Sequence, residues 1–166
     1  MLLVEPWYAV RTRSRHEAVA STFLKASGFE EFLPTYSSRR QWSDRVKVVS
    51  LPLFSGYLFC RFDPRSANRV LAAPGVVKIV GFGGQLQAVP EAEIEAIRLL
   101  MQTGLSASPC PYLREGDAVR VRRGPLKGLD GHLLKVKNQF QFVLSLHLLQ
   151  RSICVELDAE AVEAVR

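Results

Sequence analysis

Cysteine and histidine are both scarce in this sequence. Its 166 residues include three of each, and neither type recurs at a spacing that brings metal ligands together. Cys60, Cys110 and Cys154 are widely separated and odd in number, so we expect no disulfide framework. Cys60 and Cys154 fall in strand-like segments, where a free cysteine acts as a small hydrophobic residue. We therefore predict no metal site and no cofactor.

Long apolar runs and catalytic patterns are also missing. No segment approaches the ~20 apolar residues needed to cross a bilayer, and no basic region precedes the apolar N-terminus as in a signal peptide. No serine or cysteine lies in a nucleophile elbow, and the glycine cluster GFGG at 81–84 lacks the spacing of a phosphate-binding loop. We expect a monomeric, cytoplasmic protein, without a membrane partner, that binds other molecules and is not an enzyme.

The composition is that of a globular protein with a positive charge. Hydrophobic residues make up 48% of the chain and charged residues 23%, and the net charge is +6. Residues 1–105 contain 13 basic and 9 acidic side chains, and residues 106–166 contain 9 and 7. Both halves are therefore positive, which favours a polyanionic partner such as a nucleic acid.

Strands and helices are expected to alternate along the first 105 residues. The expected elements are strand 7–10, a helix from Ser14 to Ser27, strand 29–33, strand 53–62, a short helix after Asp63-Pro64, strand 76–80 and a helix from Pro90 to Thr103. The polar, basic segment 37–47 is expected to form a loop or a projecting hairpin. This order is that of the split βαβ, ferredoxin-like fold, with helices on one face of an antiparallel sheet and one extra helix.

The helix limits rest on specific residues. Ser14 and Glu17 have the spacing of a capping box, and Gly28 suits the position just past the helix end. The predicted apolar stripe of this helix is Val19, Phe23 and Ala26, and that of the last helix is Ile94, Ile97 and Met101. Asp63 is expected to cap the short helix, with Pro64 at its first position.

The strand at 53–62 has large apolar residues on both faces. Leu58, Cys60 and Phe62 alternate on one face, which we expect to lie against the helices. Tyr57 and Phe59 then lie on the open side of the sheet. They either meet a partner there or pack beneath the last helix or against the second domain.

The second part of the chain has a different periodicity. Residues 106–113, with two prolines and small side chains, are expected to be a linker. From residue 114 to residue 166 apolar residues alternate by twos, and Gly124, Gly128 and Gly131 mark turns or close approaches. We predict a small all-β barrel of about five strands.

Both parts are similar to one protein family. The segments WYAV (7–10), PLFSGYLFCRF (52–62) and PGVVKIVGFGG (74–84) resemble the N-terminal domain of NusG, which implies such a domain over residues 1–105. The segment GDAVRVRRGPLKGLDGHLLKV (116–136) resembles a KOW motif, which implies an SH3-like barrel over 114–166. TRSRHE, RQWSDR and SLHLLQRSICVEL are similar to specialised paralogues of the RfaH, LoaP and UpxY kind. Ser55 departs from the family, which usually has proline there.

The resemblance implies a bacterial transcription elongation or antitermination factor. Its first domain is expected to bind the clamp helices of the largest RNA polymerase subunit through Phe54, Tyr57 and Phe59. The residues expected to contact the non-template DNA strand are Arg13, Arg15, His16, Arg39, Arg40 and Arg45. The KOW motif residues are Arg120, Arg122, Arg123, Gly124, Lys127, Gly128 and Gly131. They imply nascent RNA, Rho or a small-subunit ribosomal protein as a second partner.

An RNA-binding module is the alternative. SGYLFCRF also resembles the RNP1 strand of an RRM, whose aromatic residues stack bases on an open sheet. The match is partial, since RNP1 has a basic residue where Ser55 stands and a small one where Leu58 stands. This alternative also leaves the KOW-like half without a role.

Overall fold

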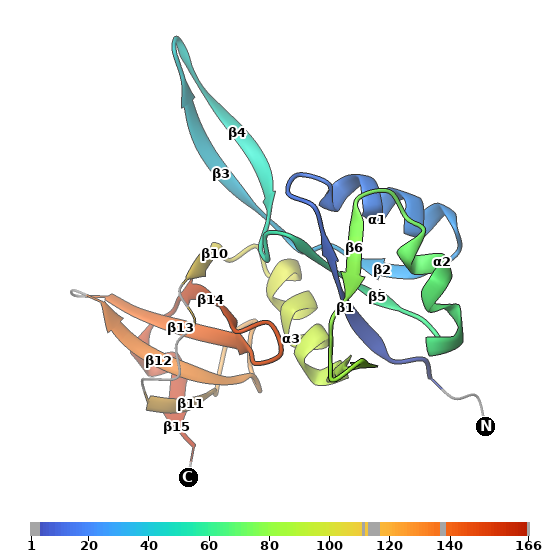
Figure 1. Ribbon diagram of the computed structural model, residues 1–166. Coiled ribbons are helices and arrows are strands. Elements are labelled where there is room, and N and C mark those ends of the chain that lie inside the picture. The colour runs from blue at the N-terminus through green and yellow to red at the C-terminus, as the bar shows by residue number, and fades with distance from the viewer. Residues whose placement is uncertain (1–3, 111, 113–116, 137–138, 166) are drawn as a thin grey trace. The chain divides into compact units, whose positions relative to one another are not determined.

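The computed structural model describes residues 4–110, 112, 117–136 and 139–165, and it divides into two compact units, Met1–Ile94 and Glu95–Arg166. Figure 1 labels the elements of both units. The division falls inside a helix, earlier than the predicted end of the first domain at residue 105, and the predicted limits stay a prediction. Residues 111 and 113 of the predicted linker, and 114–116 of the predicted KOW domain, lie outside the described residues.

The first unit contains the ferredoxin-like sheet. Its strands are β1 (Trp7–Thr12), β2 (Glu30–Phe32), β3 (Thr35–Trp42), β4 (Arg45–Pro52), β5 (Tyr57–Arg61), β6 (Val76–Ile79), β7 (Gly81–Phe82), β8 (Gln85–Leu86) and β9 (Ala88–Val89). Its helices are α1 (Glu17–Ala26), η1 (Pro64–Ser66) and α2 (Ala67–Leu71), and α3 (Glu91–Gln102) begins in this unit. The sheet order is β2-β5-β1-β6, all pairs are antiparallel, and β9 also pairs with β1. The predicted α+β fold is confirmed.

One face of this sheet forms the core with α1 and α2. Leu58, Cys60 and Phe62 are fully buried there, as predicted from their alternation. They pack in one cluster with Leu24 of α1 and Val70 of α2. Figure 1 shows both helices on the same side of the sheet. Burial raises the pKa of the Cys60 thiol to about 12, so this cysteine stays a neutral apolar residue.

Helix α1 corrects two predictions. It begins at Glu17 after His16, and the Ser14–Glu17 capping box is wrong because the Glu17 carboxylate bonds elsewhere in the chain. The buried apolar positions are Ala20 and Leu24, whereas the predicted stripe residues Val19 and Phe23 are 51% and 40% exposed. The true stripe is therefore one residue further along the helix.

The other helix limits follow the sequence more closely. Gly28 has φ +90°, which suits a glycine just past a helix end, and its N–H donates to the Lys25 carbonyl. The Asp63 carboxylate accepts the Arg65 N–H at 2.9 Å, so the predicted cap is confirmed. In α3, Ile94 and Ile97 are buried as predicted, but Leu100 is buried in place of Met101.

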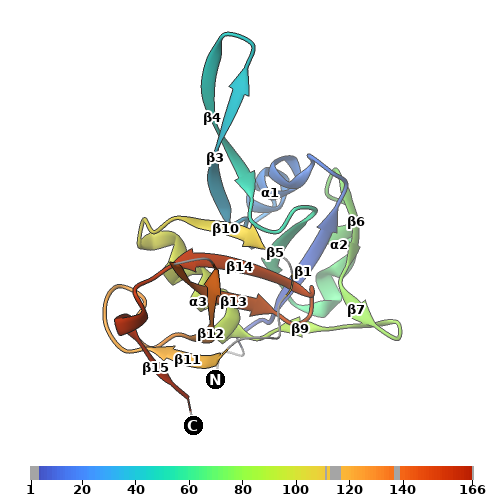
Figure 2. The same cartoon turned by 90° about the vertical axis from the view of Figure 1, so that its left-hand side faces the viewer.

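A projecting hairpin was one of the two expectations for segment 37–47, and it forms over the longer range 35–52. Strands β3 and β4 pair along their full length, from Thr35 opposite Pro52 to Trp42 opposite Arg45. A two-residue turn, Ser43-Asp44, joins them. Figures 1 and 2 show that the hairpin extends away from the sheet of its own unit.

Apart from the end of α3, the second unit is built on a six-stranded antiparallel sheet. Its strands are β10 (Ala107–Cys110), β11 (Asp117–Val121), β12 (Asp130–Val136), β13 (Gln139–Leu146), β14 (Arg151–Glu156) and β15 (Val162–Ala164), with the short helix η2 (Ala159–Ala161) before β15. The order is β10-β14-β13-β12-β11-β15. The predicted all-β region is confirmed. Strand β10 lies inside the predicted linker, where Pro109 is tolerated because β10 is at the edge of this order.

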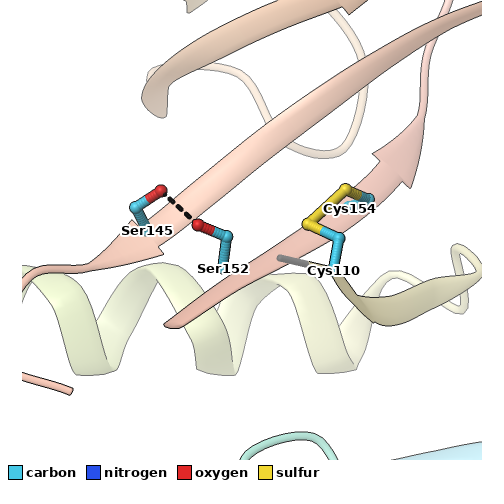
Figure 3. Close-up of a disulfide and its surroundings, with 4 residues drawn as sticks. All are labelled: Cys110, Ser145, Ser152 and Cys154. Carbon is cyan, nitrogen blue, oxygen red and sulfur yellow. Dashed lines mark hydrogen bonds between the residues drawn. A yellow bond between two sulfur atoms is a disulfide. The ribbon is translucent and has the colours of Figure 1, made fainter. Parts of the chain in front are cut away.

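The cysteines of the second unit were predicted wrongly. Cys110 and Cys154 form a disulfide, with their Cα atoms 6.0 Å apart, and they lie 44 positions apart in the sequence. Strand β10 brings them together, since Ser108 lies opposite Cys154 and Cys110 opposite Ser152. The two cysteines are thus diagonal neighbours on one face. Figure 3 shows the disulfide near the hydrogen bond that joins Ser145 and Ser152.

Candidate functional site

The predicted aromatic patch of the first unit is mostly buried. Phe54 is 1% exposed and Phe59 0%, and only Tyr57 has substantial accessible surface. The Phe59 ring packs edge-on against Phe54, with centroids 5.7 Å apart, and against Phe32 at 6.2 Å. The second face of β5 is therefore not the open aromatic surface that the alternation suggested. Phe59 of β5 packs with Phe54 from the preceding loop and with Phe32 of β2, and Tyr57 lies two positions before Phe59 on β5.

The loop before β5 is held by a contact that the sequence did not predict. The Gly56 N–H donates to Glu17 Oε1 at 2.8 Å, and the Gly56 carbonyl accepts the Thr12 N–H at 2.8 Å. Glu17 is only 4% exposed, so this carboxylate acts inside the fold. Gly56 has φ +84°, a conformation that favours glycine. These two bonds fix the geometry of the loop that contains Ser55.

Arg61, at the end of β5, is a second residue that sequence analysis missed. Its guanidinium lies 4.9 Å from the centre of the Trp7 ring and forms ion pairs with Glu30, at 3.3 Å, and with Glu91. The side chain is only 18% exposed. It joins three segments of the unit around the edge of the aromatic cluster. A lone arginine at a strand end gives no sequence signal for this role.

The loop between β1 and α1 exposes three of the predicted DNA-contacting residues, Arg13, Arg15 and His16. Its backbone is well fixed, because the Arg13 N–H donates to the Gly75 carbonyl at 2.8 Å. His16 Nδ1 lies 2.9 Å from the Ser14 carbonyl oxygen. Arg15 has φ +65°, an uncommon conformation for a non-glycine residue. The loop therefore presents two arginines and a histidine from an ordered backbone.

The hairpin exposes Arg39, Arg40 and Arg45, but not on one face. Residues directly opposite in an antiparallel pair share a face, and faces alternate along each strand. Arg40 is two positions before Trp42, which is opposite Arg45, so these three share a face. Arg39 is opposite Val48 on the other face. The structure brings two of the three predicted arginines together.

The basic residues of the second unit are paired with acidic and carbonyl groups. Arg120 forms two hydrogen bonds with Asp130, at 2.7 and 3.1 Å. Arg123 pairs with the Glu160 carboxylate at 3.0 Å, and Arg122 donates to the Glu160 carbonyl at 2.8 Å. Lys127 is exposed. Three of the four predicted cations are therefore engaged within their own unit.

The glycines of the KOW-like segment have two different roles. Gly124 and Gly128 have φ +89° and +96°, which explains glycine in the loop before β12. Gly131 lies within β12, and a Cβ there would come within 2.6 Å of the Phe142 ring and of the Val143 carbonyl oxygen. Glycine at this position permits close approach of β12 and β13.

Among the described residues, no three His, Cys, Asp or Glu side chains gather in a way that could hold a metal ion. In the same part of the chain, no helix is long and apolar enough to cross a membrane. The candidate site is thus a set of surfaces: the Tyr57 region, the β1–α1 loop, the hairpin and the KOW-like segment. The first unit is α+β and the second is mainly β, so these surfaces belong to a protein of two folded units.

Comparison with known proteins identifies the family. The family model described as "Transcription termination factor nusG" matches residues 5–98. The "Transcription termination/antitermination protein NusG" of Thermus thermophilus is 31% identical over 175 residues, which cover 92% of this chain and 94% of the relative. The chain belongs to the NusG family of transcription termination and antitermination factors. These are transcription factors and not enzymes.

A solved structure supports the fold. The structure titled "Domain interaction in Thermotoga maritima NusG" matches with a TM-score of 0.61 and 21% sequence identity, covering 98% of both chains. At this identity the similarity concerns the arrangement of elements. It agrees with the ferredoxin-like order of the first unit and the β-rich second unit.

Proposed function

We propose that this chain is a specialised NusG-type elongation and antitermination factor. Its N-terminal domain, residues 1–105, binds the clamp helices of the largest RNA polymerase subunit. A linker, 106–113, leads to the KOW domain, 114–166, which binds a second partner. The factor favours the closed, elongating polymerase to the extent that it binds this state better than the paused one.

The proposed contact with RNA polymerase rests mainly on Tyr57. It is the member of the predicted aromatic set with accessible surface, and it follows directly on Gly56, which is fixed by Glu17 and Thr12. An aromatic side chain on a rigid segment binds at a low cost in conformational entropy. Phe54 and Phe59 support Tyr57 from the packed cluster. This division of roles replaces the three equivalent contacts expected from the sequence.

The test is binding of the full chain to core RNA polymerase, with Tyr57→Ala compared with wild type. Removal of a central aromatic contact is expected to weaken binding about tenfold or more. Phe82→Ala is the matched control, because Phe82 is an aromatic residue of the same unit and is 87% exposed. Phe59→Ala is unsuitable, since a cavity at a fully buried phenylalanine costs about 3–5 kcal/mol of stability. Equal binding by Tyr57→Ala and wild type would exclude the proposal.

For the second unit, we propose a protein partner, such as Rho or a small-subunit ribosomal protein, ahead of nascent RNA. The support is that Arg120, Arg122 and Arg123 are engaged with Asp130 and Glu160. An RNA phosphate would have to compete with these bonds. The test is to measure binding of Rho, of the ribosomal protein and of RNA to the full chain. Tight RNA binding that is lost when the three arginines are neutralised would make RNA the preferred partner.

The RRM alternative has less support. RNA stacking on the sheet needs accessible aromatic rings, whereas Phe59 is fully buried between Phe32 and Phe54. The family assignment also accounts for the all-β unit that the alternative leaves unexplained. If RNA affinity fell in Tyr57→Ala while polymerase affinity did not, the alternative would regain support.

A further inference from the structure

The β3–β4 hairpin has two chemically different faces. The pairs Trp42–Arg45 and Arg40–Lys47 lie on one face, which we call the Trp42 face. The opposite face carries Arg39 with two exposed valines, Val46 and Val48. The Trp42 face thus combines one aromatic ring with three cations near the tip of the hairpin.

The groups on the Trp42 face are accessible. Trp42 is 55% exposed, in contrast to Trp7, the other tryptophan of the chain, which is 1% exposed. Lys47 Nζ lies 5.4 Å from the Trp42 ring centroid, so a cation already accompanies the ring. Within the described residues, none of the three cations of this face has an ion-pair partner.

Charge and shape together indicate the kind of ligand. Segment 35–52 has four basic residues, and its one acidic residue, Asp44, lies in the turn. An exposed aromatic ring with cations beside it is the combination that binds single-stranded nucleic acid, because bases stack on the ring while the cations contact phosphates. A base inside a duplex cannot stack in this way without leaving its helix.

We propose that the Trp42 face is a stacking site for single-stranded DNA, in which Trp42 stacks one base and Arg40, Arg45 and Lys47 contact the flanking phosphates. The choice of DNA rests on the proposed function, because a transcribing polymerase exposes a displaced DNA strand. Neither Trp42 nor Lys47 was among the DNA-contacting residues predicted from the sequence. Arg39 has no part in this site, since it lies on the other face.

The first test is binding of a short, dye-labelled oligothymidylate to the full chain. Trp42→Ala is expected to weaken binding about tenfold, the typical loss when a stacking ring is removed. Trp42→Phe, which keeps an aromatic ring, is expected to retain most of the affinity. Val48→Ala, on the opposite face of the same hairpin, is the matched control and is expected to bind like wild type. Because both positions are exposed, the three variants are expected to fold.

Tryptophan fluorescence gives an independent readout. Stacking of a base on Trp42 is expected to quench the tryptophan emission of wild type. In Trp42→Phe the remaining tryptophan is the buried Trp7, so saturating oligothymidylate is expected to cause no quenching. Equal affinity of Trp42→Ala and wild type would overturn the proposal. So would tighter binding of oligouridylate RNA or of duplex DNA than of the oligothymidylate.

Polymerase binding separates this proposal from the proposed function. If Tyr57→Ala binds polymerase like wild type but Trp42→Ala loses oligothymidylate, the proposed function fails and the stacking site stands. If the oligothymidylate does not bind and Trp42→Ala weakens polymerase binding instead, the face contacts protein and the stacking site is wrong.

Discussion

The hairpin and the second unit use similar basic residues in opposite ways. On the hairpin, Arg40 and Arg45 project from a two-stranded ribbon without acidic partners among the described residues. In the second unit, Arg120 and Arg123 pair with Asp130 and Glu160. A count of positive charge in the sequence does not distinguish these cases. The difference indicates that the hairpin cations are available to a polyanion, whereas Arg120 and Arg123 mainly hold loops and strands of the second unit together.

If this comparison is right, changes that loosen the second unit should leave DNA binding intact, and changes on the hairpin should do the reverse. The disulfide gives the largest expected effect. For a loop closed by residues 44 positions apart, chain-entropy reasoning gives about 4 kcal/mol of stabilisation. Cys110→Ser is therefore expected to increase hydrogen exchange in β13 and β14 strongly, with no change in oligothymidylate affinity.

Reduced wild type is the control for this prediction. In excess dithiothreitol it should exchange like Cys110→Ser, because both lack the bond. A cytoplasm keeps most thiols reduced, so the two forms also correspond to two redox conditions. If oxidised wild type and Cys110→Ser exchange equally fast, the disulfide does not stabilise the unit. If DNA affinity falls as well, the two regions are not independent.

Gly131→Ala is the next largest change. The added methyl group would meet the Phe142 ring and the Val143 carbonyl oxygen at 2.6 Å, so β12 and β13 would have to separate. Overpacking of this kind typically costs about 1–3 kcal/mol. Gly128→Ala is the control, since nothing lies near its Cβ and only its positive φ opposes the change, at about 1–2 kcal/mol. Thermal unfolding and hydrogen exchange in β12 should both show that Gly131→Ala is the more destabilised variant.

These cases show which features the sequence could predict. Leu58, Cys60 and Phe62 were placed correctly because alternation in a strand is a local property. Asp63 was also placed correctly, since its capping bond spans two residues. The ferredoxin-like order followed from the succession of such local patterns.

Long-range partners could not be predicted in this way. Glu17 has the right spacing for a capping box with Ser14, but its carboxylate accepts the N–H of Gly56 instead. The Cys110–Cys154 bond depends on strand β10. This strand lies in a segment whose two prolines and small residues are typical of a linker. The alternation that placed Phe59 on the second face was correct, yet it gave no information on whether that face is covered.

The charges themselves can be compared directly with two matched triple variants. Each variant removes three positive charges. The hairpin triple is Arg40→Gln, Arg45→Gln, Lys47→Gln, and the second-unit triple is Arg120→Gln, Arg122→Gln, Arg123→Gln. Each phosphate contact with a single strand contributes about 0.7 to the salt dependence of log K, so the hairpin triple should lower that slope by up to about 2. The second-unit triple should leave the salt dependence of log K nearly unchanged and destabilise the second unit. Equal slopes in the two triples would mean that only net charge matters.

Asp130→Asn gives the smallest and most specific effect. The bonds from Arg120 hold the pKa of Asp130 below its usual range. A carboxyl with a lowered folded pKa contributes stability above its unfolded pKa, about 3.9, and loses it as the pH falls through the folded value. Wild type should therefore be slightly more stable than Asp130→Asn near neutral pH, and this difference should shrink as the pH falls below the unfolded pKa and vanish below the lowered folded pKa. The effect is small because the pair is half exposed.

The same variant also tests the comparison between the two regions. Without Asp130, Arg120 loses its two hydrogen bonds to a carboxylate and keeps Glu163, opposite it on β15, as an acidic neighbour, and the net charge rises by one. If availability of the cation is what matters, Asp130→Asn should gain a little oligothymidylate affinity and a salt slope steeper by at most about 0.7. Asp158→Asn changes the net charge equally without freeing Arg120, and it should bind like wild type. An equal gain in oligothymidylate affinity in both variants would assign the effect to overall charge. It would remove the distinction between the hairpin and the second unit.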